Sequence, residues 1–308
     1  MRIYSAGFYL FTRQHLFGVK EKPPAMAPFE GYDPDHALES YHYIYKSFDM
    51  MAWLRERKRS IFLDSGAFSA FTLGAKIDLE AYSKFIRDWG DCLDCASNVD
   101  IIGAGNEQGG YDNQKLLEKM GATVCPVHHA RDQDYWLERY LDEGYDYIFL
   151  GGMVPESTTY LKLWLDRVWG KYLTNKDGTP KVKVHGFGLT TESLMYRYPW
   201  YSVDSTSWLA GNMRGACMID LVDPYGNPCT QTIGFAENHI DLVKYGKHFD
   251  NLAPDIQKKV LEIIEKNGYK IEDLHKMYGS RSKWNIDYFK RQAPRACKRF
   301  ILEQEGLF

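Results

Sequence analysis

The chain has 308 residues, of which 44% are hydrophobic and 26% charged, and its formal net charge is −3. This composition is ordinary for a soluble protein, and the net charge excludes a polycation that binds nucleic acid by charge alone. No apolar run approaches the roughly 20 residues that span a bilayer, and the N-terminal segment shows no signal-peptide cleavage site. We therefore expect a soluble intracellular protein with no membrane partner.

Short β-rich apolar runs alternate with amphipathic helical patterns along the chain. In chain order the runs cover residues 2–8, 41–45, 60–64, 99–105, 122–128, 146–152, 181–188 and 200–205. Eight strands separated by helices are typical of a (β/α)8 barrel, and a doubly wound open sheet is the alternative. We predict an α/β protein with a TIM-like barrel over residues 1–235, including long loop insertions at 10–38 and 205–235. The helical pattern that follows predicts a partly basic extension over 236–308, packed on the barrel.

The six cysteines are spread along the chain, which is typical of reduced thiols in a cytoplasmic protein. Cys92 and Cys95 are closely spaced but have no second ligand pair at zinc spacing. The other candidate zinc ligands are far apart: Cys217, Cys229, His239 and His248. We therefore expect no metal site.

Acids, imidazoles and glycines close most of the predicted strands. They are Asp64, Asn106, Glu107, His128, His129, Gly151, Gly152, His185, Gly186, Gly188 and Asp204. In a (β/α)8 barrel these strand ends meet at one mouth, where the active site forms. The acids could act as nucleophile and proton carrier, and bare glycines let a planar ligand approach the backbone. Each residue alone also fits a structural role, as a cap, a turn glycine or a core histidine, but together they favour a site.

Five segments carry a resemblance to a known family: LDSGAFSAF, VDIIGAGNE, FLGGMVPES, VHGFGLTTESL and YSVDSTS. In order and spacing they resemble signature segments of the tRNA-guanine transglycosylase superfamily, over residues 61–210. The chain is most similar to the short, zinc-less, phage-encoded branch. The resemblance implies a (β/α)8 enzyme without a cofactor that replaces guanine in DNA with a free 7-deazaguanine base, in the host cytoplasm if a phage encodes it.

The resemblance also implies roles for individual residues. Asp204 would be the nucleophile that forms a covalent glycosyl-aspartate, and Asp64 would be the general acid and base. Phe68 and His185 would stack on opposite faces of the base. The other substrate-binding positions would be Ser65, Gly66, Asn106, Glu107, His128, Gly151, Gly152, Met153 and Gly186. Of these, Asn106 stands where the bacterial enzymes carry a base-reading acid.

A basic stretch near the C-terminus interleaves with aromatic residues and is a candidate nucleic-acid contact. Its candidate phosphate-binding residues are Lys290, Arg291, Arg295, Lys298 and Arg299. Such a pattern suits phosphates and stacked bases, although a solvated helix face has the same composition. We expect DNA as the partner. The alternatives are tRNA, a non-catalytic nucleic-acid-binding subunit and a small-molecule glycosidase of the same fold; a homodimer is left open.

Overall fold

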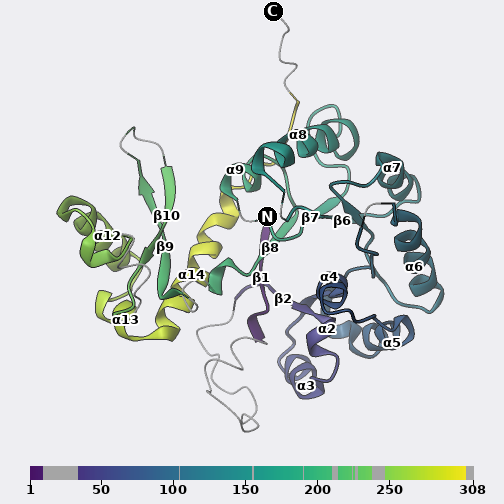
Figure 1. The fold of residues 1–308 in the computed structure, drawn as a ribbon, viewed down its shortest axis with the longest axis horizontal. Helices are drawn as coiled ribbons and strands as arrows, with labels where there is room; N and C mark the ends of the chain where they lie inside the picture. Colours follow the sequence, from purple (N-terminus) through teal and green to yellow (C-terminus); the bar gives the residue numbers. More distant parts are fainter. Residues whose placement is uncertain are drawn as a thin grey trace, which may run out of the picture. The chain divides into compact units, whose positions relative to one another are not determined.

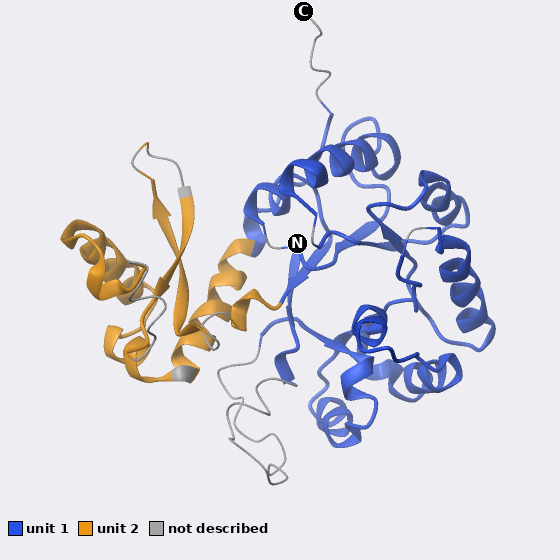
Figure 2. Ribbon diagram, viewed as in Figure 1, with its two compact units in different colours: residues 1–205, 293–308 blue, residues 206–292 orange. Residues whose placement is uncertain are grey.

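The computed structural model describes residues 1–9, 34–103, 105–154, 156–189, 191–209, 214–223, 225, 228–237 and 247–302. The chain forms two compact units, shown in blue and orange in Figure 2. Unit 1 comprises Met1–Ser205 and Ala293–Phe308, and unit 2 comprises Thr206–Gln292. Most of the predicted insertion at residues 10–38 lies outside the described residues.

Unit 1 is built on eight parallel strands (Figure 1). They are β1 (Arg2–Ala6), β2 (Ala37–Ser40), β3 (Ile61–Asp64), β4 (Leu93–Ala96), β5 (Val127–His129), β6 (Tyr147–Gly151), β7 (Lys183–Gly186) and β8 (Ser202–Ser205). Their order in the sheet is β4-β3-β2-β1-β8-β7-β6-β5. The two edges meet through a parallel bridge between Ser97 and Cys125, where the Cys125 amide donates to the Ala96 carbonyl at 2.8 Å. The predicted (β/α)8 fold is confirmed.

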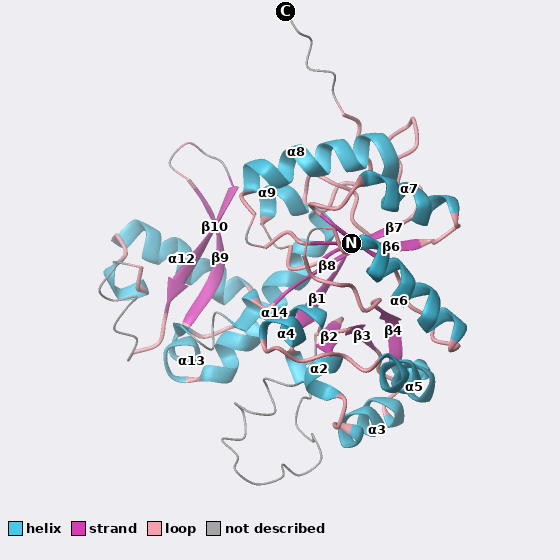
Figure 3. Cartoon of the chain, turned by 45° about the vertical axis from the view of Figure 1, so that its right-hand side comes forward, coloured by secondary structure: helices cyan, strands magenta, loops and turns pink. Residues whose placement is uncertain are grey.

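Helices surround these strands on the outside of the sheet (Figures 1 and 3). They are α3 (Phe48–Glu56), α5 (Leu79–Trp89), α6 (Glu107–Lys119), α7 (Asp134–Asp142), α8 (Thr158–Val168) and α9 (Glu192–Met195). Two further short helices, α2 (Tyr41–Ile44) and α4 (Ala67–Thr72), follow directly on β2 and β3. In α5, for example, the Asp78 side chain caps the first turn, and Tyr82, Phe85 and Ile86 form the buried stripe. None of the described helices is long and apolar enough to cross a membrane.

Two of the eight strand positions were predicted wrongly. Residues 41–45 form α2 and the residue after it, because the strand is the preceding segment Ala37–Ser40. The described residues of the predicted strand at 99–105, which are 99–103 and 105, lie in no strand, and Gly103 and Gly105 there adopt positive φ angles that are unusual in strands. The fourth strand is instead Leu93–Ala96, whose register places Cys95 beside Phe62 of β3.

Aromatic side chains fill the centre of the barrel. The Phe62 ring lies 4.8 Å from Phe149 and 5.4 Å from Tyr4, measured between ring centroids. Ala6, Leu38 and Val127 complete this cluster of buried residues. Because the barrel interior is packed with side chains, a ligand has room only beyond this layer, at the mouth.

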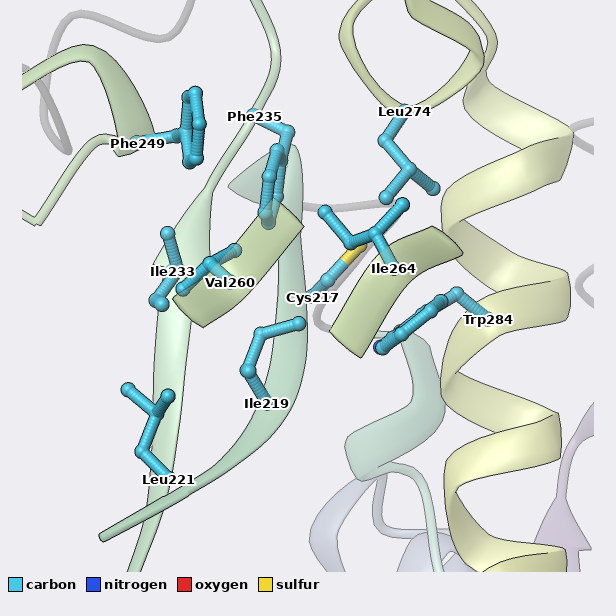
Figure 4. Close-up of a cluster of buried hydrophobic side chains, with 10 residues drawn as sticks. All are labelled: Cys217, Ile219, Leu221, Ile233, Phe235, Phe249, Val260, Ile264, Leu274 and Trp284. Atoms are coloured by element: carbon cyan, nitrogen blue, oxygen red, sulfur yellow. The ribbon is translucent and has the colours of Figure 1, made fainter. Parts of the chain in front are cut away.

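The described part of unit 2 combines an antiparallel hairpin with the α-helices α12, α13 and α14. These are β9 (Ala216–Val222), β10 (Pro228–Gly234), α12 (Pro254–Lys266), α13 (Ile271–Lys276) and α14 (Tyr278–Gln292). They share one buried core, drawn in Figure 4, of Cys217, Ile219, Leu221, Ile233, Phe235, Phe249, Val260, Ile264, Leu274 and Trp284.

The division between the units differs from the predicted boundary after residue 235. The hairpin Ala216–Gly234 contributes its buried side chains to the core of the helices that follow it, so it belongs to unit 2. The residues after α14 return to unit 1, where the Phe300 amide donates to the Gly178 carbonyl at 2.8 Å.

Trp284 should be the residue on which unit 2 depends most. It is completely buried, and its indole N–H donates to the Met218 carbonyl at 2.8 Å. We expect Trp284→Ala to lower the free energy of unfolding by about 3 to 5 kcal/mol, measured by urea denaturation. Tyr225→Ala, at a side chain that is 89% exposed, is the control and should change it by less than about 0.5 kcal/mol. Equal effects of the two variants would contradict this role.

Candidate active site

Two aspartates lie at the mouth of the barrel. Along a strand, side chains alternate between the two faces, so Asp64 shares the inward face of β3 with Phe62. Asp204 on β8 lies beside Tyr4 of β1, which also faces inward. The negative charge of Asp204 contributes to the raised pKa of Asp64, so the two carboxylates share one electrostatic environment.

The buried Asp204 is held through one of its two oxygens. Oδ1 accepts the Gly188 amide at 2.8 Å and lies 3.2 Å from His185 Nε2. Among the described residues, no donor is bonded to Oδ2. The carboxylate is therefore oriented by the protein, while its second oxygen is available for chemistry.

His185 supports Asp204 from below. It is completely buried, and burial lowers its pKa despite the opposing hydrogen bond and charge of Asp204, so the ring is neutral. A neutral ring that donates Nε2–H to Asp204 must accept at Nδ1, where Ser202 Oγ lies at 2.6 Å. Ser202 Oγ in turn lies 2.6 Å from the Tyr147 hydroxyl. This chain of hydrogen bonds fixes the imidazole tautomer.

The expected stacking role of His185 does not fit this position. Its ring packs edge-on against Phe62, with 4.5 Å between the ring centroids, and against Phe187 at 4.8 Å. Since no part of the side chain is exposed, neither face of the ring can receive a base in this structure. His185 positions the acid instead.

Asp64 has a different environment. Its Oδ2 accepts the Gly66 amide at 3.0 Å, and Ser97 Oγ lies 3.5 Å from Oδ1. Burial and, secondarily, the negative charges of Asp100 and Asp204 raise the pKa of Asp64 to about 7, although the Gly66 hydrogen bond opposes the shift. A carboxyl with this pKa can both donate and accept a proton near neutral pH.

Ser65 and Gly66 hold Asp64 at the start of α4. The Ser65 amide donates to Ser97 Oγ at 2.7 Å, which links the ends of β3 and β4. Gly66 has a φ of +78°, and a Cβ there would overlap Ser40 Oγ and lie 2.6 Å from His42 Cβ. Both residues therefore act as structural supports. One turn further on, the ring of Phe68 is 64% exposed and is available for stacking.

Strand β5 carries two adjacent histidines, His128 and His129, of which only His129 lies at the mouth. His128, which was predicted to be in the site, points away from the barrel interior and stacks on Trp164 of α8, with 6.3 Å between ring centroids. Burial lowers its pKa to about 4. Val127 is in the barrel core, so His129, two residues later on the same face, is the one at the mouth. Its Nε2 lies 2.8 Å from Asp100 Oδ2.

The loop after β4 brings Asp100 to the mouth, and the sequence analysis did not select it. Its charge raises the pKa of Asp64. Asn106 is exposed and stands at the N-terminus of α6, with Nδ2 3.5 Å from the Ile102 carbonyl. Glu107, the first residue of α6, lies close enough to His129 to contribute to its raised pKa. Asp100 is the acid within VDIIGAG and could have been selected from the sequence. Because the strand was predicted over 99–105, Asp100 was placed near its beginning and not at its C-terminal end.

The glycines at the ends of β6 and β7 fit protein side chains. A Cβ on Gly151 would lie 2.8 Å from His129 Cδ2, and one on Gly152, whose φ is +66°, would lie 3.0 Å from His129 Cβ. The side chain of Met153 is buried, which leaves its main chain as the part that could meet a ligand. Gly186 packs on the outer side against Leu189 and Trp200 and does not face the mouth.

The predicted nucleic-acid contacts are divided between the units. Lys290 and Arg291 belong to unit 2, whereas Arg295, Lys298 and Arg299 belong to unit 1. Arg291 lies over the Trp284 ring at 5.0 Å, so it is occupied within unit 2. Three aromatic residues of the stretch are buried and cannot stack bases in this structure: Trp284, Tyr288 and Phe289. Lys298 and Arg299 are exposed.

The cysteines and histidines of the loop after Asp204 do not form a common site among the described residues. Cys217 lies in the unit 2 core, where burial raises the pKa of its thiol above the usual range. His248 is buried, with Nε2 3.3 Å from the Ala236 carbonyl. His239 lies outside the described residues. Within the described part of the chain, no three His, Cys, Asp or Glu side chains are placed to hold a metal ion.

A comparison of the chain with protein-family models finds no matching family, and a search of curated proteins finds no matching sequence. The functional conclusion therefore depends on the geometry of the mouth and on the sequence resemblance.

The raised pKa of Asp64 should make stability depend on pH. The folded protein binds a proton at Asp64 up to about pH 7, whereas the unfolded chain loses it near the ordinary aspartate pKa of 3.8. Stability is therefore lost as pH rises through this window. We expect Asp64→Asn to raise the free energy of unfolding by about 4 kcal/mol at pH 8 and to change it little at pH 4.

Urea denaturation at the two pH values measures this difference. Asp142→Asn removes an exposed acid of α7 and is the control, for which no such pH-dependent gain is expected. Equal changes by Asp64→Asn at both pH values would show that the ionised carboxylate is not the destabilising group.

Proposed function

We infer that the barrel mouth catalyses base exchange, in which a guanine in DNA is replaced by a free 7-deazaguanine base. The observation that carries this proposal is the pair of carboxylates in contrasting environments. Asp204 is oriented through Oδ1 with Oδ2 open, and Asp64 has a pKa raised to about 7 by burial and by neighbouring acids. Carboxyl pairs with separate roles are typical of glycosyl transfer with retention of configuration.

In the first displacement, Asp204 Oδ2 attacks the anomeric carbon of the target nucleotide. A C–O bond to Asp204 forms while the glycosidic C–N9 bond breaks, and the bonding electrons leave with guanine. Protonated Asp64 supplies the proton that neutralises the departing base. The product is a covalent glycosyl-aspartate with inverted configuration, and Asp64 is now a carboxylate.

The second displacement reverses these roles. Asp64 takes the proton from N9 of the incoming base, and this nitrogen attacks the anomeric carbon. The bond to Asp204 breaks, its electrons return to the carboxylate, and configuration is restored by the second inversion. Asp64 is protonated again, so the cycle needs no cofactor.

The supports of Asp204 assist both steps. Two donors on Oδ1, from Gly188 and His185, fix the carboxylate before substrate binds, which removes the cost of ordering it during the reaction. Because burial keeps His185 neutral, it orients Asp204 without adding a positive charge next to the nucleophile.

Base recognition would use the exposed ring of Phe68 and the free oxygen of Asp100. Phe68 offers a stacking face on α4. His129 occupies Asp100 Oδ2, which leaves Oδ1 to accept an N–H from the base edge. In this proposal Asp100 takes the reading role that the sequence resemblance had assigned to Asn106.

The two acids should respond differently to substitution. We expect Asp204→Ala to abolish incorporation of labelled guanine into DNA, because the attacking oxygen is lost, and to abolish any denaturation-stable protein–DNA adduct. Asp64→Asn should bind DNA normally and slow exchange by at least about 100-fold. Asp142→Asn is the matched control and should exchange at the wild-type rate. An adduct formed by Asp204→Ala, or near-normal exchange by Asp64→Asn, would remove that residue from the mechanism.

DNA is the leading substrate, and tRNA is the alternative. A flipped or single-stranded deoxyguanosine needs only a base slot and a few phosphate contacts. We expect labelled guanine to enter DNA rather than tRNA, at a rate that falls as salt rises. Labelling of tRNA alone would overturn this choice. Binding of DNA without exchange into either nucleic acid would favour a non-catalytic subunit.

The exposed pair Lys298 and Arg299 provides a charge test. Neutralising both should weaken DNA binding and reduce the slope of log affinity against log salt by about 1.5 if each contacts one phosphate. Neutralising Lys258 and Lys259, which are exposed on α12, changes the net charge equally and should leave the slope nearer to wild type. The same change in both variants would show an effect of net charge alone.

A further inference from the structure

His129 lies within a group of acids at the mouth of the barrel. Its Nε2 is 2.8 Å from Asp100 Oδ2, and its Nδ1 is 3.7 Å from Asp132 Oδ2. The backbone amide of His129 also donates to Asp132 Oδ2 at 2.7 Å. The ring is thus held between two carboxylates from different loops, those after β4 and β5.

The neighbouring strand confines the ring from the other side. Gly151 and Gly152 of the β6 end lie so close to His129 that a Cβ on either would crowd its side chain. Bulkier residues would displace the imidazole from Asp100. The two glycines therefore preserve the geometry of the His129–Asp100 pair.

The charges around His129 favour its protonated form. Burial, the largest single influence, would lower its pKa, but the hydrogen bond and charge of Asp100 together with the charges of Asp132 and Glu107 outweigh it, so the pKa is raised. These acids come from the β4–α6 loop, the β5–α7 loop and α6. The packed end of β6 contributes only glycines, and the adjacent buried His128 is neutral because burial lowers its pKa to about 4.

Asp100 also raises the pKa of Asp64. After burial, the negative charge of Asp100 is the largest contribution to this shift. An imidazolium bonded to Asp100 offsets part of that negative charge. We propose that His129 is a positioning residue that holds Asp100 in place and screens the charge of Asp100 from Asp64. The protonation state of the acid in the mouth is thereby set by a histidine that does not itself meet the reacting atoms.

This proposal requires opposite effects from the two partners. His129→Gln keeps a hydrogen-bond donor but removes the positive charge, so Asp100 acts unscreened and Asp64 should hold its proton to a pH higher by roughly one unit. Asp100→Asn removes the negative charge, so Asp64 should lose its proton at a pH lower by about the same amount. A purely structural disturbance of the mouth would not give shifts of opposite sign.

The titration of Asp64 can be followed directly by NMR of protein labelled with ¹³C at the aspartate carboxyl carbon, with Asp64→Asn identifying the signal. His128→Gln is the control, because that side chain lies outside the mouth, and it should leave the titration unchanged. Shifts in the same direction for His129→Gln and Asp100→Asn, or no shift for His129→Gln, would overturn the proposal.

The link to catalysis rests on the proposed function, whereas the titration does not. In exchange assays the alkaline limb of the kcat/KM profile should move up in pH for His129→Gln and down for Asp100→Asn, because guanine departure needs protonated Asp64. Opposite NMR shifts without exchange in the wild type would reject the proposed function alone. Wild-type exchange without those shifts would reject the role of His129 alone.

Discussion

The alternation of side chains along closed parallel strands is the constraint on which the mouth depends. Each strand presents every second residue to the barrel interior, and the aromatic layer of Tyr4, Phe62 and Phe149 fills that interior. An inward residue beyond this layer must therefore lie at the mouth. The same alternation directs the residues in between outward, toward the helices. For this reason His129 lies at the mouth, whereas the adjacent His128 packs against Trp164 of α8.

Bringing several carboxylates to one small mouth has an energetic cost. Buried like charges disfavour one another's ionised forms, which is why the pKa of Asp64 rises with burial and with the charges of Asp100 and Asp204. The protein offsets part of this cost with backbone donors at Gly66 and Gly188. Such electrostatic destabilisation is expected where a carboxyl must carry a proton at neutral pH, because a solvated carboxyl would be ionised.

Unit 2 shows how similar residues serve a different purpose. From the sequence, the basic and aromatic stretch at the end of unit 2 was predicted to bind nucleic acid. In the structure, its residues Trp284, Tyr288 and Phe289 are buried. Arg281 donates to the Leu274 carbonyl at 2.6 Å and is itself buried. These three aromatic residues are core residues of unit 2, whereas the basic residues Arg295, Lys298 and Arg299, which belong to unit 1, are exposed.

The sequence by itself determined the fold class, because strand and helix periodicities repeat eight times and depend only on local patterning. It also predicted that Asp64 and Asp204 lie at the ends of strands: Asp64 closes the apolar run of β3, and Asp204 is the last residue but one of β8. The sequence misplaced the fourth strand, because Leu93–Ala96 is short and has only a weak apolar pattern. As a result, Asp100 was not predicted to lie at the mouth. Only the tertiary structure decided that Asp100 and His129 meet there and that His185 lies beneath Asp204, because inward direction follows from strand register, which pairing between distant segments sets.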